Sequence, residues 1–199
     1  YPPSAMVTEA IRQEAGSPLR LYPDPECTAL RETIASYHGL TPDRIFVGNG
    51  SDEVLAMCFY AFFSPGKAIV FPDITYSFYP VYAQLFGLDY REIPLDENFG
   101  VPVEQFLGNN GGVVIANPNA PTGRDLPLHA IRKIADANPE AVVMVDEAYV
   151  DFGAHSAVAL LDICPNLVVV RTLSKSRSLA GLRVGYAMGS AGLIAAINC

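Results

Sequence analysis

The stretch Asn166 to Met188, NLVVVRTLSKSRSLAGLRVGYAM, decides the fold of this chain. It begins with a short apolar run, Leu167 to Val170, whose three valines are typical of a buried strand. A polar turn around Lys175 follows, and then a glycine-containing segment with Arg183. In open parallel sheets, ligands bind just beyond the carboxyl ends of the strands. The stretch therefore indicates either a ligand site at Lys175 and Arg183 or a solvated loop that happens to be basic.

Upstream, short apolar runs alternate with segments of helical periodicity. The predicted strands are 45–47, 68–71, 90–93, 113–116, 142–145 and 167–170, and the predicted helices between them are 52–63, 76–86, 103–107 and 128–137. Two earlier helices are expected, one capped by Ser4 and one over about 26–37 that ends at Gly39. Alternation of this kind implies parallel pairing through right-handed crossovers, with helices on both faces. The prediction is a single α/β domain over residues 1–199, a three-layer α/β/α structure with a mostly parallel sheet.

Composition limits the classes of function. The chain carries 21 acidic and 13 basic side chains, a net charge of −8, and no basic block, which argues against a nucleic-acid partner. No apolar run approaches the roughly 20 residues that cross a membrane, so no membrane partner is expected. The four cysteines fall singly, without metal or redox spacing, and no signal peptide is visible. These features favour a protein of the reducing cytoplasm that binds a small molecule.

Two glycine- or proline-rich turns follow predicted strands. GNGSDE, at 48–53, precedes a helix whose free N–H groups, together with Ser51, suit a phosphate; the alternative is an ordinary cap formed by Ser51 and the two acids. NPNAPTG, at 117–123, contains two X-Pro bonds, the usual place for a cis peptide. This turn either presents the Asn119 amide rigidly to a ligand or is a rigid turn without one.

A further strand ends in two consecutive carboxylates, in VDEAY at 145–149. Buried carboxylates need a cationic partner, and a metal is conceivable, but no histidine or further acid stands at a suitable spacing. The alternative is a pair of helix-capping acids. If this strand neighbours the one before Lys175, then Asp146 and Lys175 face one crevice. Pyridoxal phosphate (PLP) requires such a set: an amine for covalent attachment, an acid for the ring nitrogen and an anion pocket.

Five motifs occur in the order and spacing of the fold-type I PLP-dependent aminotransferases: GNGSDE, PDITYSFYPVYA, NPNAPTG, VDEAYVDFG and RTLSKSRSLAGLRVGY. The chain resembles this family over essentially all 199 residues, and within it the histidinol-phosphate aminotransferases and their near relatives. The resemblance implies the large PLP-binding domain of a homodimeric enzyme of histidine biosynthesis. Such an enzyme moves an amino group between a donor such as L-histidinol phosphate and 2-oxoglutarate.

The resemblance also implies a role for individual residues, by their position in the motifs. Lys175 would hold PLP covalently and then serve as the catalytic base, Asp146 would pair with the pyridine nitrogen, and Tyr149 would hydrogen-bond the ring oxygen. Tyr22 would reach the phosphate of the neighbouring subunit's cofactor, and Tyr1 would approach the substrate. The other implied cofactor contacts are Ser51, Asp52, Tyr76, Asn119, Thr172, Ser174 and Arg183.

The sequence departs from the family pattern in two places. Relatives commonly have Asn directly before Pro-Thr-Gly, where this chain has Ala120, so we expect Asn119 to replace that contact through a shifted backbone. Family members also carry a small C-terminal domain with a substrate-binding arginine and a longer N-terminal arm. The chain starts at Tyr1 rather than Met, and we expect it to be a piece of a longer enzyme that is inactive alone.

Other functions stay open. Enzymes of the same fold decarboxylate threonine phosphate or transaminate aromatic amino acids, and a PLP-fold binding or regulatory module without turnover is an alternative of another class. A generic α/β domain with a solvated lysine is the remaining alternative. The three histidines, His38, His129 and His155, are expected to be surface or packing residues, and no metal site is expected.

Overall fold

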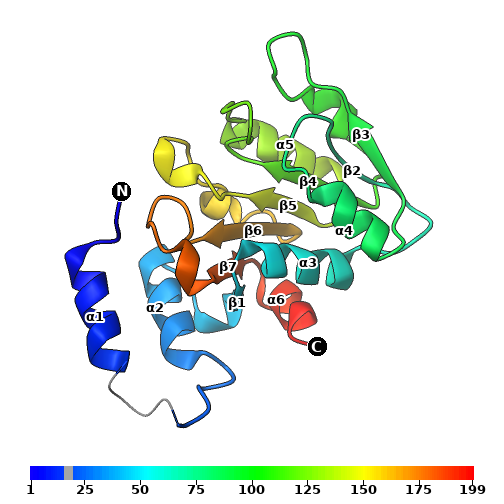
Figure 1. Ribbon diagram of the computed structural model, residues 1–199. Coiled ribbons are helices and arrows are strands. Elements are labelled where there is room, and N and C mark those ends of the chain that lie inside the picture. The colour runs from blue at the N-terminus through cyan, green and yellow to red at the C-terminus, as the bar shows by residue number, and fades with distance from the viewer. Residues whose placement is uncertain (16–19) are drawn as a thin grey trace.

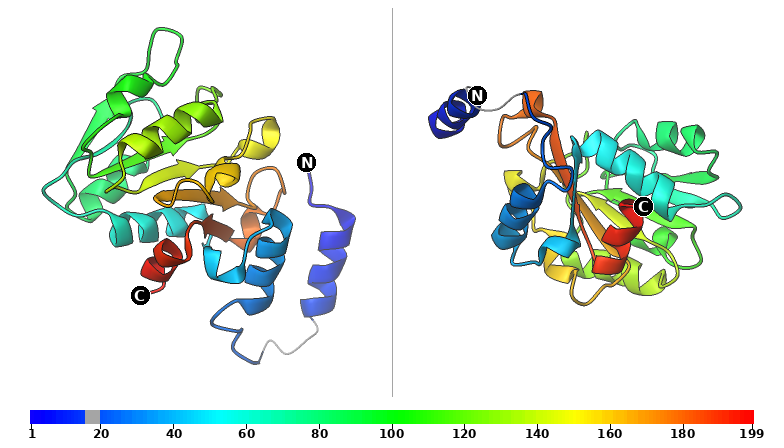
Figure 2. Two further views of the ribbon diagram at one scale, coloured as in Figure 1. Left: turned by 180° about the vertical axis from the view of Figure 1, so that it is seen from behind. Right: turned by 90° about the horizontal axis from the view of Figure 1, so that it is seen from below.

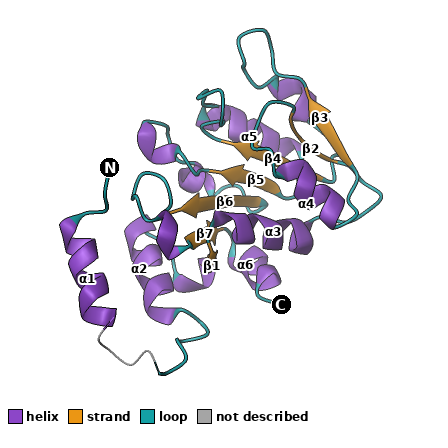
Figure 3. Ribbon diagram, in the orientation of Figure 1, coloured by secondary structure: helices purple, strands orange, loops and turns teal. Residues whose placement is uncertain are grey.

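The computed structural model describes residues 1–15 and 20–199, in which seven strands form one sheet between helices (Figure 1; Figure 3). The strands are β1 (Ile45–Asn49), β2 (Ile69–Pro72), β3 (Tyr90–Ile93), β4 (Gly112–Ala116), β5 (Val143–Asp146), β6 (Leu167–Thr172) and β7 (Val184–Met188). Their order across the sheet is β1-β7-β6-β5-β4-β2-β3. All six predicted strands are present, so this part of the prediction is confirmed.

The sheet is mostly parallel, with one exception that the sequence pattern did not reveal. β7 pairs antiparallel with both β6 and β1, while the pairs β2–β3, β2–β4, β4–β5 and β5–β6 are parallel. β1 therefore runs in the same direction as the other five strands. The segment VGYAM was not predicted as a strand because Gly185 interrupts its apolar pattern, and glycine in a strand interior weakens the signal.

The helices cover both faces of the sheet, as predicted (Figure 2). Their bounds are α1 (Ala5–Ala15), α2 (Thr28–His38), α3 (Ser51–Phe62), α4 (Tyr79–Leu85), α5 (Leu128–Ala137) and α6 (Ala191–Ile197). Alternate residues of the central strands enter two separate apolar clusters, one with α2 and α5 and the other with α3, α4 and α6. In β6, for example, Val169 belongs to the first cluster and Val168 to the second. Strands buried on both faces explain the continuous apolar runs in the sequence.

Several helix ends agree with the sequence signals, and two segments differ. The Ser4 hydroxyl accepts the Val7 N–H at 3.3 Å, and Gly39 ends α2 with a φ of 69°. α4 begins at Tyr79, three residues later than predicted, with Pro80 in its first turn. The predicted helix at 103–107 is a short 3₁₀ turn, Val103–Phe106.

α1 lies beyond the β1 edge of the sheet, where it stands apart from the other elements in the right-hand view of Figure 2, and none of its residues is buried. Within the described part of the chain, no helix has the length and apolar character that crossing a membrane requires.

The topology places the site. β5 and β6 are parallel neighbours, with Asp146 opposite Val170 in the register. Their carboxyl ends therefore lie side by side, and the residues that follow them, including Lys175, emerge at the same edge. The strand that ends at Asp146 therefore neighbours the strand that precedes Lys175, which is the condition for the two residues to share one crevice.

Candidate active site

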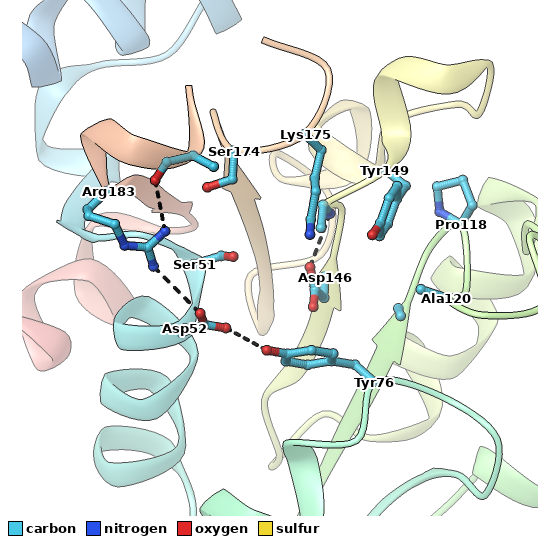
Figure 4. A pocket seen from close by; sticks show the side chains of 13 residues that line it. Ser51, Asp52, Tyr76, Pro118, Ala120, Asp146, Tyr149, Ser174, Lys175 and Arg183 are labelled. Carbon is cyan, nitrogen blue, oxygen red and sulfur yellow. Dashed lines mark hydrogen bonds and ion pairs between the residues drawn. The ribbon is translucent and has the colours of Figure 1, made fainter. Parts of the chain in front are cut away.

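A cavity of about 220 Å³ opens at this edge of the sheet (Figure 4). It lies beyond the carboxyl ends of β4, β5 and β6, where ligands bind in open α/β sheets. Most residues expected at the cofactor face it. The lining consists of Ser51, Asp52, Tyr76, Ala116, Pro118, Ala120, Asp146, Ala148, Tyr149, Ser174, Lys175, Ala180 and Arg183.

The Asp146 carboxylate lies in the deep part of this cavity, with only 5% of the residue exposed. One oxygen accepts the Tyr79 hydroxyl at 2.9 Å and the other accepts the Ala148 N–H at 3.1 Å. Burial raises the pKa of Asp146, although both hydrogen bonds and the charge of Lys175 act in the opposite direction. Among the described residues, no ion pair involves Asp146, so a buried carboxylate faces the cavity without a direct cationic partner.

Lys175 and Tyr149 flank Asp146 at the mouth of the cavity (Figure 4). The Lys175 ammonium nitrogen lies 5.4 Å from the centre of the Tyr149 ring. Lys175 is exposed and belongs to the turn that follows β6, while Tyr149 belongs to the turn that follows β5. The two parallel strands thus deliver an amine, a phenol and a carboxylate to one place.

The opposite end of the cavity is built by the N-terminus of α3 together with Ser174 and Arg183 (Figure 4). Free N–H groups at a helix N-terminus attract anions. The two acids at this helix start both have partners within the chain. The Asp52 carboxylate lies 3.6 Å from the Arg183 guanidinium and accepts the Tyr76 hydroxyl at 2.7 Å, whereas the Glu53 carboxylate turns back to accept the Asn49 N–H at 2.6 Å.

Arg183 occupies its place because Gly50 has no side chain. Gly50 has a φ of +88°, and a Cβ atom there would lie 2.4 Å from the Arg183 Nη2 atom. Arg183 also has a positive φ, 54°, and its Nη1 donates to the Ala180 carbonyl at 3.1 Å. These contacts hold the guanidinium against the start of α3.

Asn119 is not part of the lining, whereas Ala120 is. The buried Asn119 amide donates to the Ile74 carbonyl at 2.8 Å and accepts the Thr75 hydroxyl at 2.7 Å. The turn contains cis peptides at Asn117-Pro118 and Ala120-Pro121. Asn119 therefore braces the loop that precedes α4, and its replacement of the usual asparagine contact stays a prediction.

Thr172 is buried and also lies outside the lining. Its hydroxyl accepts the Ser174 N–H at 3.1 Å and lies 2.9 Å from the Ser174 hydroxyl oxygen.

Tyr22, outside the lining as well, is fully exposed, with a relative exposure of 101%. Tyr1 is also fully exposed, and it lines a separate groove, of about 810 Å³, that Lys175 shares. Neither tyrosine meets the cavity within this chain.

Tyr79 is the main site residue that sequence reasoning missed. It is fully buried in α4, where an aromatic side chain in an apolar helical pattern indicates core packing rather than a site. Burial raises its pKa well above the usual value, so the phenol stays protonated and can donate to Asp146. No pattern around PDITYSFYPVYA distinguishes this tyrosine from its neighbours.

The described residues contain no group of three or more histidine, cysteine or acidic side chains suited to a metal ion. His38 lies away from the cavity, with its Nε2 atom 3.1 Å from the Tyr186 hydroxyl. Burial and the nearby Arg171 lower its pKa to about 4. His38 is therefore neutral and packed against the sheet, as expected for a packing residue.

Comparison with known proteins places this geometry in a family. The family model for aminotransferase class I and II matches residues 1–199. Histidinol-phosphate aminotransferase 2 of Thiobacillus denitrificans is 57% identical over 198 residues, which cover 100% of this chain and 56% of that protein. The chain thus spans about half the length of the curated relatives that it matches.

Solved structures agree. The histidinol-phosphate aminotransferase of Sinorhizobium meliloti, in complex with pyridoxal-5'-phosphate, is 29% identical with a TM-score of 0.90, and the match covers 99% of this chain and 56% of that one. The L-threonine-O-3-phosphate decarboxylase of Porphyromonas gingivalis has the same fold, with 22% identity and a TM-score of 0.85 over 98% of this chain and 62% of that one. The fold, the cavity at the carboxyl edge and the family match lead to one conclusion: the chain belongs to the aminotransferase class I and II family.

Proposed function

We propose that this chain is the cofactor-binding part of a PLP-dependent aminotransferase that acts on histidinol phosphate. The observation that carries the proposal is the buried Asp146 carboxylate, which faces the cavity without a direct ion-pair partner among the described residues. Tyr79 and Ala148 already donate hydrogen bonds to this carboxylate, but a buried charge is costly unless it is paired as well as hydrogen-bonded. The protonated ring nitrogen of PLP supplies such a partner.

The other lining residues fit the rest of PLP. Its phosphate matches the α3 N-terminus, the Ser51 and Ser174 hydroxyls and the Arg183 guanidinium, because arginine and free N–H groups are strong phosphate donors. Tyr76 lies on one side of the cavity as a platform for a flat ring, and Tyr149 offers a phenol to the ring oxygen (Figure 4). When bound, PLP supplies the electron-withdrawing ring that weakens bonds at the substrate carbon.

The chain's own groups supply positioning and proton transfer. Asp146 keeps the ring nitrogen protonated, and the Tyr79 hydroxyl favours the ionised form of Asp146 by donating to it. Lys175 Nζ, at the mouth of the cavity, is placed to take a proton from the substrate carbon and to return it. Arg183 fixes the phosphate end of the cofactor and thereby the orientation of the cofactor ring at Asp146.

We infer the substrate from the relatives, since the fold alone does not choose it. Relatives named histidinol-phosphate aminotransferase match the whole chain at 54–57% identity. The proposed reaction therefore transfers an amino group from L-histidinol phosphate to 2-oxoglutarate. The decarboxylase of the same fold makes threonine phosphate the substrate to be tested beside it.

We further propose that the working enzyme is a cytoplasmic homodimer in which Tyr22 of one subunit completes the phosphate end of the other. Two observations support this. Tyr22 is fully exposed and contributes nothing to the cavity of its own chain. All four cysteines are free, as expected in a reducing compartment.

The test of cofactor binding uses the 199-residue chain. It is incubated with PLP, the visible absorbance is recorded, and the product is reduced with borohydride and mapped by peptide mass spectrometry. The expected result is one adduct, on Lys175, which disappears in Lys175→Ala. The matched control is Lys67→Ala, because Lys67 is an exposed lysine outside the cavity.

The test of turnover uses a full-length polypeptide that carries this chain. Glutamate formation from L-histidinol phosphate and 2-oxoglutarate is expected, and Lys175→Ala is expected to abolish it. Release of CO₂ from threonine phosphate without glutamate formation would identify the enzyme as a decarboxylase rather than an aminotransferase. If the cofactor-binding test gave neither the visible absorbance nor the Lys175 adduct, only a role without PLP would remain.

A further inference from the structure

The turn that carries Lys175 is held by residues that do not line the cavity. Two backbone hydrogen bonds close it: the Ser178 N–H donates to the Lys175 carbonyl at 3.0 Å, and the Leu179 N–H donates to the Leu173 carbonyl at 3.1 Å. These bonds fix the shape of the turn. They do not fix where the turn sits relative to the neighbouring turn that carries Tyr149.

Asp151 makes that connection. It lies two residues after Tyr149, in the short 3₁₀ turn Val150–Phe152. Its Oδ2 atom accepts the hydroxyl of Ser176, the residue next to Lys175, and lies 3.4 Å from the Arg177 Nε atom. With 30% of its side chain exposed, Asp151 is partly removed from water, so these charge-assisted contacts are stronger than those of a fully solvated pair.

The other Asp151 oxygen is tied to a buried anchor. Oδ1 lies 3.7 Å from Arg171 Nη1, and the Arg171 Nε atom donates to the Glu147 carboxylate at 2.9 Å. The Glu147 side chain is fully buried and also accepts the Ser156 hydroxyl at 2.9 Å. Arg171 belongs to β6 and its side chain is only 11% exposed, so its guanidinium ties Asp151 to a buried point of the sheet.

We propose that Asp151 is a positioning residue that sets the place of Lys175 relative to Tyr149. It joins the Lys175 turn to the Tyr149 turn through Ser176, and it connects both turns to β6 through Arg171. The inference rests on the proposed function only in that Lys175 is the residue that attaches PLP. The connection itself is a property of the chain without cofactor.

The first experiment measures backbone hydrogen exchange by NMR in the cofactor-free chain. The Ser178 and Leu179 amides report on the turn, since both are hydrogen-bonded inside it. Ser176→Ala removes one hydrogen bond to a charged group, and exchange at these two amides is expected to rise about tenfold while Tm barely changes. Asp151→Ala is expected to have at least the same effect, and the double variant none beyond Asp151→Ala alone, because the two residues act through one contact.

Ser178→Ala is the matched control. It removes a hydroxyl from the same turn that forms no side-chain hydrogen bond with the described residues, and exchange at Leu179 is expected to stay unchanged. Ser176→Thr keeps a hydroxyl at the bonding position and is expected to restore most of the protection. If Asp151→Ala does not fold, Ser176→Ala and Ser176→Thr still decide the question, because a half-buried serine tolerates both changes.

The second experiment measures position rather than stability. The visible circular dichroism of bound PLP depends on how the ring is held, so its intensity is expected to change in Ser176→Ala and to return in Ser176→Thr. Faster exchange with unchanged circular dichroism would make Asp151 merely structural and overturn the proposal, as would unchanged exchange in Ser176→Ala. If wild-type chain traps no PLP on Lys175, the proposed function fails and this inference with it; normal trapping with unchanged exchange overturns this inference alone.

Discussion

Burial of the Asp146 carboxylate links the stability of the cofactor-free chain to pH. Its pKa is raised above 3.8, mainly by burial, so the folded chain binds this proton more tightly than the unfolded chain does. The ionised carboxylate therefore destabilises the fold progressively as the pH rises from 3.8 through the pKa of the folded state, and the full penalty remains at higher pH.

Asp146→Asn removes this penalty because an amide does not ionise, and the Tyr79 hydroxyl can accept from the new NH₂ group. We expect the cofactor-free variant to be more stable than wild type at neutral pH by roughly 1–3 kcal/mol, with the difference shrinking toward acid pH. Urea unfolding at several pH values measures this. The same variant is expected to bind PLP at least about tenfold more weakly, since it cannot pair with a protonated ring nitrogen. A stability difference that does not vary with pH would contradict the ionised state of Asp146.

Tyr79 favours the ionised form of that carboxylate. Its hydroxyl donates to Asp146 at 2.9 Å, and this hydrogen bond lowers the pKa of Asp146. Tyr79→Phe is therefore expected to raise the pKa of Asp146 further, which ¹³C NMR of the labelled carboxyl group measures.

Tyr82→Phe is the control for Tyr79→Phe, because the two tyrosines share α4. The Tyr82 hydroxyl is buried and finds no hydrogen-bond partner among the described residues. Its removal is expected to leave the pKa of Asp146 unchanged and to be neutral or stabilising. Equal shifts in both variants would mean that loss of any buried hydroxyl, rather than of this bond, changes Asp146.

At the scale of single residues, the sequence reveals groups that stand at strand ends and misses groups that act through packing. Asp146, Tyr149 and Lys175 follow apolar runs, so their convergence was predictable once the two strands were taken as neighbours. Tyr79 was not predictable, because its hydroxyl reaches Asp146, 67 residues away in the sequence, from inside an apolar helix face. The direction of the Asn119 amide was likewise set by Ile74 and Thr75, residues distant in sequence.

At the scale of elements, β7 positions the phosphate end of the cavity. It lies between β1 and β6 and passes directly beneath the start of α3. A Cβ atom on Gly185 would lie 2.3 Å from the Ser51 nitrogen, closer than any real contact. Gly185, which interrupts the apolar pattern of this strand in the sequence, is therefore the residue that lets the N-terminus of α3 approach the sheet.

Gly185→Ala is expected to displace the start of α3 and to destabilise the chain by about 2–3 kcal/mol, the cost of overpacking against backbone atoms. Because Ser51 and the free N–H groups move with the helix, PLP affinity is expected to fall by about tenfold or more. Urea unfolding and a PLP titration measure the two effects.

Gly189→Ala provides the comparison at the end of the same strand, since its Cβ atom would find only ordinary contacts, the nearest at 3.4 Å. This change is expected to have little effect on either quantity. Full PLP affinity in Gly185→Ala would show that the cavity does not depend on the close approach of β7 and α3.

The whole molecule assembles the cavity from segments that are far apart in the sequence. The lining comes from 51–52, 76, 116–120, 146–149 and 174–183, which the strand order brings to one edge of the sheet. Alternation of strands and helices predicted this edge, since parallel strands end together. The alternation of strands and helices did not predict which residues of another subunit would complete the cavity, because exposed residues such as Tyr22 carry no pattern that identifies their partner.

The shared site of the proposed dimer gives a prediction at this scale. Two full-length subunits are combined, one with Tyr22→Phe and the other with Lys175→Ala. If Tyr22 serves the neighbouring cavity, each mixed dimer contains one cavity with both its own Lys175 and the partner's Tyr22. After random mixing, about a quarter of all cavities are then expected to be intact. Activity is therefore expected to reach about a quarter of the wild-type value, well above that of either variant alone.

The opposite arrangement gives a different result. If Tyr22 serves its own chain, the subunit with Lys175 always lacks the tyrosine hydroxyl, and mixing restores nothing beyond the residual activity of Tyr22→Phe. The control pairs Lys175→Ala with Asp146→Asn, two changes that both lie in the chain's own cavity. In those mixed dimers every cavity stays damaged, so recovery in the first mixture but not in the second would assign Tyr22 to the neighbouring subunit.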